Sequence, residues 1–196
     1  MARKTKARTA RKSAGRKATR PAPRKATKKA ARPKAKKQAR RPTKTQVAAA
    51  LQSVTPYLVV SSGHHAIEFY KNAFGAVEVY RMPAPDGTRL LHATLNIRGS
   101  DVMLSDEFPE HGGNRGPDNV GSTTVTIHLW VSNADEAFAQ AIAAGASVIM
   151  PLADMFWGDR YGKLRDPFGH EWSIAHHIRD VSPAEIAEAA KRIFLP

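Results

Sequence analysis

Several short runs of the sequence place histidine, aromatic and hydroxyl side chains at every second position. In residues 124 to 131, Thr126, His128 and Trp130 alternate with the apolar residues Ile127 and Leu129. Because successive side chains of a β-strand point to opposite faces, the apolar set is expected to meet a helix and the polar set to line the other face. The same alternation selects Thr55, Tyr57, His92, Thr94, Asn96, Met103, Ser105, Glu171, Ser173 and Ala175. A cupped sheet with such polar and aromatic walls is the default small-molecule site.

A second cluster of reactive side chains lies between residues 155 and 165. Trp157, Arg160 and Tyr161 stand there among glycines, in a segment more polar and more bulky than a routine hairpin. Arg160 could bind an anionic ligand group through two parallel hydrogen bonds, with Trp157 and Trp130 offering faces for stacking. The alternative is that Arg160 pairs with Asp159 or Asp166 and only fixes the hairpin.

The predicted ligand-binding residues share one expected face or one expected loop of the cup. They are Tyr57, His92, Thr126, His128, Trp130, Trp157, Arg160 and Ser173. No residue is assigned a catalytic role. A metal site formed by His92 and His128 with Glu107 or Glu171 stays open as an alternative, but isolated histidines on a polar strand face are more often hydrogen-bonded than metal-bound. We therefore expect no metal ligand and no cofactor.

The elements that must position these side chains follow from the hydrophobic pattern. Strands are predicted near 54–60, 76–83, 89–97, 100–107, 122–132, 146–152, 160–166 and 171–177, and helices near 64–74 and 134–144. The order strand, helix, three strands thus occurs twice. Residues 58–76 also align with residues 129–146, which indicates an internal duplication. The predicted fold class is α+β, with tandem βαβββ modules forming a cupped mixed sheet.

A further helix is predicted at the C-terminal end. Ser182 precedes Pro183, and Glu185 follows three residues after Ser182, which is the pattern of a capping box. The predicted organisation is a basic tail at 1–46, a linker at 47–53, a folded domain at 54–178 with modules 54–108 and 122–178, and a C-terminal helical segment at 179–196.

The charge of the chain is divided sharply between the tail and the rest. Residues 1–46 hold 20 of the 31 Lys and Arg and no acid, whereas the remainder holds 11 basic and 17 acidic residues. The tail is also free of aromatic residues, so it cannot bury enough apolar surface to offset the entropy of ordering, and we expect it to be disordered. Twenty positive charges without a counter-charge favour a polyanion as the partner. The residues expected to contact nucleic acid are Arg8, Arg11, Lys12, Arg16, Lys17, Arg24, Lys25, Lys28, Lys29, Lys36, Lys37, Arg40 and Arg41.

The composition of the tail also fits three alternative roles. It could bind an anionic membrane surface, act as a solubility or targeting segment, or serve as an organelle transit peptide. The absence of cysteine excludes disulfides, thiolate zinc sites and a cysteine nucleophile, and no stretch has the about 20 apolar residues of a membrane span. A cytoplasmic location is therefore expected, with nucleoid association in a bacterium.

The motifs AIEFYKNAFGA at 66–76, WGDRYGKLRDPFGHEW at 157–172 and DVSPAEIAEAAKRIF at 180–194 resemble the PhnB-like branch of the vicinal oxygen chelate superfamily, which includes glyoxalases, bleomycin-resistance proteins and dioxygenases. The resemblance covers about residues 53–194. It implies the cupped fold, a homodimer, and metal ligands at the positions of Thr55, Met103, Thr126 and Ser173. None of these four suits zinc, nickel or iron, so a metal-independent binding protein is the expectation, with a lyase or dioxygenase of the same superfamily as the alternative.

Two stretches of the tail, TARKSAGRKA at 9–18 and APRKATKKAAR at 22–32, resemble the amino-terminal tail of histone three. A third class of function is therefore a chromatin- or nucleoid-associated protein, or one that imitates a histone tail. That function would implicate Lys12 and Ser13 as sites of modification.

Overall fold

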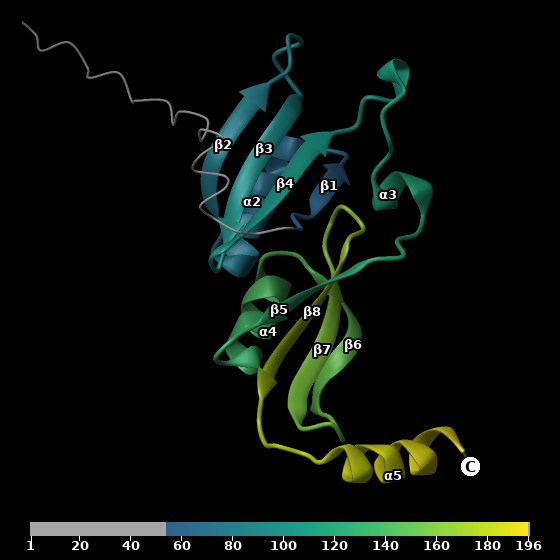
Figure 1. Cartoon of the computed structure of the whole chain (residues 1–196). Helices are drawn as coiled ribbons and strands as arrows, with labels where there is room; N and C mark the ends of the chain where they lie inside the picture. Colours follow the sequence, from purple (N-terminus) through teal and green to yellow (C-terminus); the bar gives the residue numbers. More distant parts are fainter. Residues whose placement is uncertain (1–53, 196) are drawn as a thin grey trace, which may run out of the picture. The chain divides into compact units, whose positions relative to one another are not determined.

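The computed structural model describes residues 54–195. The first module comprises β1 (Tyr57–Val60), α2 (Gly63–Phe74), β2 (Val77–Pro83), β3 (Leu90–Ile97) and β4 (Ser100–Asp106). Its strands form one sheet in the order β1-β4-β3-β2, in which β1 runs parallel to β4 and the other pairs are antiparallel (Figure 1).

The second module repeats this arrangement. It comprises β5 (Thr126–Trp130), α4 (Ala134–Ala143), β6 (Ser147–Asp154), β7 (Asp159–Arg165) and β8 (Glu171–His177). Its sheet has the order β5-β8-β7-β6, again with one parallel pair, β5 with β8. The predicted α+β fold with tandem βαβββ modules is therefore confirmed.

Three short or terminal helices complete the described chain. A 3-10 helix (Pro109–His111) and α3 (Pro117–Val120) connect the modules, and α5 (Pro183–Phe194) follows the second sheet. Ser182 and Glu185 form the reciprocal capping box expected at the start of α5. None of the helices within residues 54–195 is long and apolar enough to cross a membrane.

Two strands are shorter than the hydrophobic pattern predicts. β5 begins at Thr126 rather than near 122, because the Thr123 hydroxyl contacts the backbone N and O of Val125 at 3.3 Å and forms a local turn. β1 begins at Tyr57 rather than at 54. Pro56 lacks an N–H, and only its carbonyl pairs with β4, by accepting from the N–H of Met103.

The hydrophobic core joins the two modules. The buried face of α2 presents Tyr70 and Phe74 to Trp172 of β8, with ring centroids 5.4 Å and 4.5 Å apart. Asp166, which is also buried, accepts hydrogen bonds from the Tyr70 hydroxyl at 2.8 Å and from the Trp172 indole at 2.9 Å. Burial, together with the nearby Asp166 carboxylate, raises the pKa of Tyr70 well above its ordinary value. Tyr70 and Asp166 are therefore a buried polar link between residues 96 positions apart.

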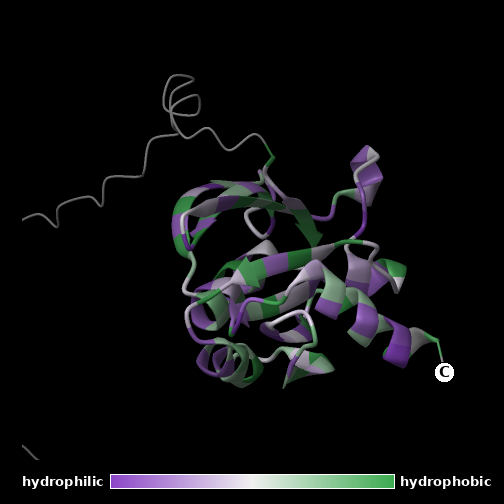
Figure 2. Cartoon of the chain, turned by 60° about the horizontal axis from the view of Figure 1, so that its bottom comes forward, coloured by the Kyte–Doolittle hydropathy of each residue, from purple (hydrophilic) through white to green (hydrophobic). Residues whose placement is uncertain are grey.

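Alternating hydropathy along the strands gives each sheet two different faces, and Figure 2 shows it as a change of colour along the ribbons. On β3, Ala93, Leu95 and Ile97 are buried in the core, and His92, Thr94 and Asn96 lie on the opposite face with partial exposure. This second face is the one on which the predicted site lies.

Candidate ligand-binding site

The polar face of the second sheet holds a cluster of aromatic rings. His128 of β5 lies against Trp130 in an edge-to-face arrangement, with ring centroids 4.8 Å apart. Its ring is nearly parallel to that of Tyr161 on β7, with centroids 6.1 Å apart and an interplanar angle of 17°. Trp157 continues the cluster by packing edge-on against Tyr161 at 5.7 Å. We call His128, Trp130, Trp157 and Tyr161 the aromatic cluster.

The alternation of β5 places these side chains as the sequence predicts. Ile127 and Leu129 pack against the hydrophobic core, and Thr126, His128 and Trp130 point to the other side and are exposed. The Trp130 side chain is 59% exposed, which is a large apolar area to leave in water. β5 therefore presents a flat aromatic surface that a planar ligand could cover.

His128 is held in place by β8. Its Nδ1 lies 2.8 Å from the Ser173 hydroxyl, and Ser173 is directly opposite His128 in the parallel ladder. Burial lowers the pKa of His128 from its ordinary value, and the smaller effect of the Asp159 charge acts in the opposite direction. At neutral pH the imidazole is therefore uncharged. It can then stack on a neutral ring and form a hydrogen bond with a ligand through Nε2.

The charged residues beside the cluster neutralise one another. Glu171 accepts from Lys163 at 2.7 Å and from Arg165 at 3.2 Å, and the Thr126 hydroxyl lies 3.4 Å from the same carboxylate. The hydrogen bond from Lys163 is the main reason that the pKa of Glu171 lies below its ordinary value. Glu171 is thus an ion-paired carboxylate, which makes it a poor general base.

The segment WGDRYG at 157–162 divides its residues between the two faces of the sheet. Tyr161 pairs with Ala175 and joins the aromatic cluster, whereas Arg160 pairs with His176 and points to the helix side. There the Arg160 guanidinium donates to Asp135 of α4 at 2.7 and 2.8 Å and to Asp154 of β6 at 2.7 Å. The structure therefore does not bring Arg160 to the predicted ligand face. Neither Asp159 nor Asp166, the partners considered from sequence, is among these contacts.

The glycines of this segment are required by close packing. Gly158 has a φ of +100°, and a Cβ there would overlap the carbonyl oxygen of Arg179. A Cβ on Gly162 would lie 2.7 Å from the ring of Phe138 and 3.0 Å from the Cα of Leu152.

Tyr161 is not among the ligand-binding residues expected from sequence, although the structure places it in the aromatic cluster. Alternation along β7 puts Tyr161 on the face opposite to Arg160, but the sequence does not say which of the two residues faces the cup. The contacts of Arg160 on the helix side show that Tyr161 is the one that does.

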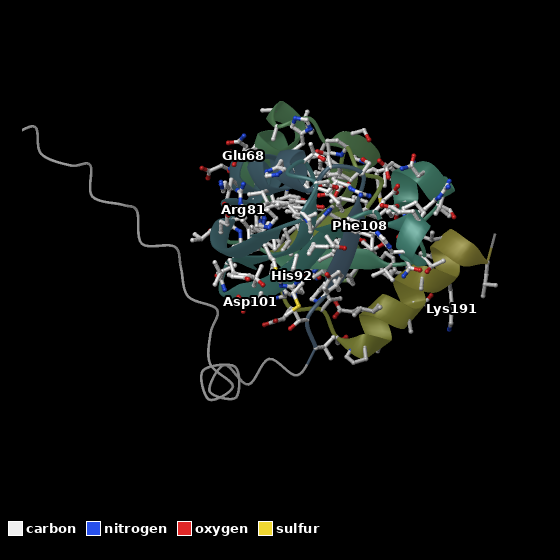
Figure 3. The ribbon with its side chains drawn as sticks, turned by 90° about the horizontal axis from the view of Figure 1, so that it is seen from above. Glu68, Arg81, His92, Asp101, Phe108 and Lys191 are labelled. Carbon is white, nitrogen blue, oxygen red and sulfur yellow. The ribbon has the colours of Figure 1, made fainter. Side chains whose placement is uncertain are left out.

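The first sheet carries a smaller polar cluster. His92 of β3, labelled in Figure 3, contacts the Thr94 hydroxyl through Nε2 at 3.0 Å and the Tyr57 hydroxyl through Nδ1 at 3.4 Å. The Tyr57 and His92 rings are 5.7 Å apart, and Tyr57 is 50% exposed. The structure thus brings Tyr57 and His92 together, on a different sheet from His128 and Trp130.

A cavity of about 820 Å³ adjoins both clusters. Of the predicted residues, Tyr57, Thr126, His128 and Trp130 line it, and His92, Trp157, Arg160 and Ser173 do not. Its other walls are largely apolar and include Leu58, Ile97, Val102, Ile127, Leu129 and Trp172. This volume is within the range of pockets that hold drug-sized ligands.

The positions at which the resemblance implies metal ligands hold side chains that are poor metal donors. Ser173 is engaged with His128 and Thr126 lies against Glu171, while Met103 stands opposite Tyr57 in the ladder between β1 and β4. A hydroxyl or a thioether is a weak ligand for zinc, nickel or iron compared with His or Glu. Within residues 54–195, no group of three or more His, Asp or Glu side chains is arranged to hold a metal.

The chain contains two βαβββ modules, and comparison with known proteins shows the family to which it belongs. The model of the Glyoxalase/Bleomycin resistance protein/Dioxygenase superfamily matches residues 47–174, and the chain belongs to this family.

Relatives are found in bacteria and plants. An uncharacterised protein of Mycobacterium tuberculosis, Rv0887c, is 48% identical over 139 residues, which cover 70% of this chain and 81% of the relative. The crystal structure of the Arabidopsis thaliana gene product At5g48480 has 30% identity and a TM-score of 0.51, and the match covers 62% of this chain and 96% of that one. Solved neighbours also include a PhnB protein from Bacillus cereus, with 20% identity, a TM-score of 0.49, and coverage of 64% and 99%.

Proposed function

We propose that the folded domain binds a planar aromatic small molecule on the polar face of its second sheet, without the help of a metal ion. The observation that carries this proposal is the aromatic cluster, in which an uncharged His128 lies between Trp130 and Tyr161 beside a cavity of drug-like volume. Offset or edge-to-face contact with such rings contributes about 0.5–1.5 kcal/mol per ring pair beyond the burial of area. His128 Nε2 supplies a polar contact that could orient the ligand.

The first test is the content of the purified protein. We expect extraction and mass spectrometry to recover an aromatic small molecule, and elemental analysis to find far less than one zinc, nickel, iron or manganese ion per chain. One tightly held ion per chain would contradict the metal-independent proposal and would favour the alternative, a lyase or dioxygenase of the same superfamily.

The second test changes one ring of the cluster. Replacing Trp130 by Ala should weaken binding of the recovered molecule about fivefold, since one ring contact is worth roughly 1 kcal/mol. Val148→Ala is the matched control, because Val148 is similarly exposed but does not line the cavity. Fluorescence titration gives the affinities, and circular dichroism should show both variants folded. Equal affinities of the two variants for the molecule would show that the aromatic cluster is not part of the ligand site.

We further propose that two copies of the chain associate. Tyr57 and Trp130 leave half or more of their surfaces in water on the open faces of the two sheets, and a partner would cover them. Light scattering coupled to size exclusion should give twice the chain mass, and a monomer at micromolar concentration would contradict this proposal.

The basic tail lies outside the described residues, and its proposed role is sequence-independent binding to nucleic acid. The support is the charge distribution along the chain, since residues 1–46 hold 20 basic residues and no acidic one. Neutralising phosphates releases counterions, which gives affinity without base recognition.

A further inference from the structure

The turn between β3 and β4 carries an arginine in an unusual backbone conformation. Ile97 pairs with Ser100, so the turn consists of two residues, Arg98 and Gly99. Both have a positive φ, of +51° and +91°, and Arg98 is the only residue other than glycine with a positive φ within residues 54–195. A two-residue hairpin turn of this kind, type I′, favours Asn, Asp or Gly at its first position. Arginine is therefore a poor choice for the turn itself.

The backbone of this turn is fixed by the side chain of Asn96. Its Oδ1 accepts from the N–H of Gly99 at 3.0 Å, and its Nδ2 donates to Asp101 at 2.8 Å. The guanidinium of Arg98, by contrast, is exposed and takes part in none of the hydrogen bonds and ion pairs among residues 54–195. Four other arginines of the two modules are ion-paired, namely Arg81, Arg89, Arg160 and Arg165. A fixed turn thus presents an arginine whose charge the fold does not use.

Arg98 lines the same cavity of about 820 Å³ as Trp130 of the aromatic cluster. Of the described residues that line this cavity, Arg98 is the only lysine or arginine, and Asp101 is the only one with a carboxylate. The carboxylate of Asp101 already accepts the hydrogen bond from Asn96. The charge that is left for a ligand in this cavity is therefore the positive charge of Arg98.

We propose that Arg98 binds an anionic group of the ligand, so that the class of ligand is a planar aromatic acid with a carboxylate, sulfonate or phosphate group. This rests on the proposed function, because the aromatic part of the ligand would lie on the aromatic cluster. A guanidinium offers several N–H donors in a planar fork that matches two oxygens of such a group. Largely apolar walls beside it screen the attraction less than open water does. The unfavourable backbone conformation of Arg98 is then explained by recognition, since strained residues often lie at ligand sites.

Two fluorescent probes that differ only in charge test this assignment on the full chain. The anion 8-anilinonaphthalene-1-sulfonate and the neutral N-phenyl-1-naphthylamine share one aromatic skeleton, and only the first carries a sulfonate. Arg98→Asn should weaken binding of the sulfonate about fivefold, the size expected for a partly exposed charge pair, and should leave the affinity for the neutral probe unchanged. Asn is favoured at this position of the turn, so the variant should have the same Tm as the wild type or a higher one. A lower Tm with equal loss of both probes would show that Arg98 serves only the turn. That result, or an unchanged affinity for the sulfonate, would overturn the proposal.

Arg192→Asn is the matched control for the loss of one positive charge. Arg192 of α5 is also exposed, but it does not line the cavity, so this variant should bind both probes as the wild type does. Both variants keep the basic tail, and any binding of the sulfonate to the tail therefore contributes equally. An equal loss of sulfonate binding in Arg192→Asn would show a general effect of charge and would overturn the assignment to Arg98.

Trp130→Ala separates a failure of this assignment from a failure of the proposed function. It should weaken binding of both probes, because both share the aromatic part that the cluster would hold. If Trp130→Ala weakens both probes and Arg98→Asn weakens neither, the aromatic site stands and the role of Arg98 is overturned. If Trp130→Ala weakens neither probe, the proposed function fails, and the role of Arg98 in it fails as well.

Discussion

Single residues of the WGDRYG segment show how one motif can serve packing and recognition together. Asp159 binds His177, Arg160 fastens β7 to α4, and Tyr161 faces the aromatic cluster. In this motif Asp159 and Arg160 therefore stabilise the fold, and Tyr161 is the residue that faces the candidate ligand site. Asp166 has a similar role. It is fully occupied by hydrogen bonds from the backbone of its turn and from Tyr70 and Trp172, which makes it structural.

The glycines give a prediction at the residue scale. Gly158→Ala should destabilise the domain by more than about 2 kcal/mol, because it combines a left-handed backbone with an overlap on the Arg179 carbonyl. Gly75→Ala is the control. Gly75 also has a positive φ, of +68°, but open space surrounds it, so the cost should be only about 1 kcal/mol. Urea denaturation measures both, and equal losses would show that the overlap is relieved by movement of residues 178–181.

At the scale of elements, His177 connects three segments of the second module. It lies at the end of β8 and contacts Asp159 of β7 and Asp180 of the loop before α5, each at 3.0 Å. The hydrogen bond with Asp159, followed by that with Asp180, raises the pKa of His177 above its ordinary value. The protonated imidazole is thus the form that the folded state favours.

This contact predicts a pH-dependent stability. A raised pKa in the folded state contributes stability that is fully present below the unfolded pKa and is lost as pH rises through the folded pKa. The wild-type protein should therefore exceed His177→Gln in Tm at pH 5.5, and the difference should shrink by pH 9. His65→Gln is the control, because His65 is an exposed histidine on α2 that contacts the uncharged Ser62 hydroxyl. A Tm difference that does not change with pH would contradict the ion-pair origin.

At the scale of the whole molecule, the tail and the domain have opposite charge. The tail carries +20 and residues 47–196 carry −6 in formal charge, so phosphate should be drawn to one and repelled by the other. Removing residues 1–46 should abolish binding to duplex DNA and leave the folded domain intact. For the full chain, log affinity should fall steeply with log salt, by about 0.9 for each phosphate neutralised, and nearly equally for unrelated sequences. Fluorescence anisotropy measures both. A truncated domain that still binds DNA at physiological salt would contradict the assignment of this interaction to the tail.

The sequence alone predicted the features that depend on local pattern. Alternation in residues 124–131 identified the face of β5 that carries His128 and Trp130. The order strand, helix, three strands, which occurs twice along the chain, identified the fold. The separation of charge at residue 46 likewise needs no structure. Each of these depends on neighbours along the chain, because strand pleat, helical period and net charge are properties of short segments.

Only the tertiary structure decided which residues meet across the chain. Whether Arg160 or Tyr161 faces the cluster depends on the register of β7 against β8, and a shift of one residue exchanges the two faces. The bond between Tyr70 and Asp166 joins residues of different modules, and the pairing of Arg160 with Asp135 needs α4 to pack beside β7. Such contacts arise from the packing of distant elements into a common core, which the spacing of residues in one segment does not specify.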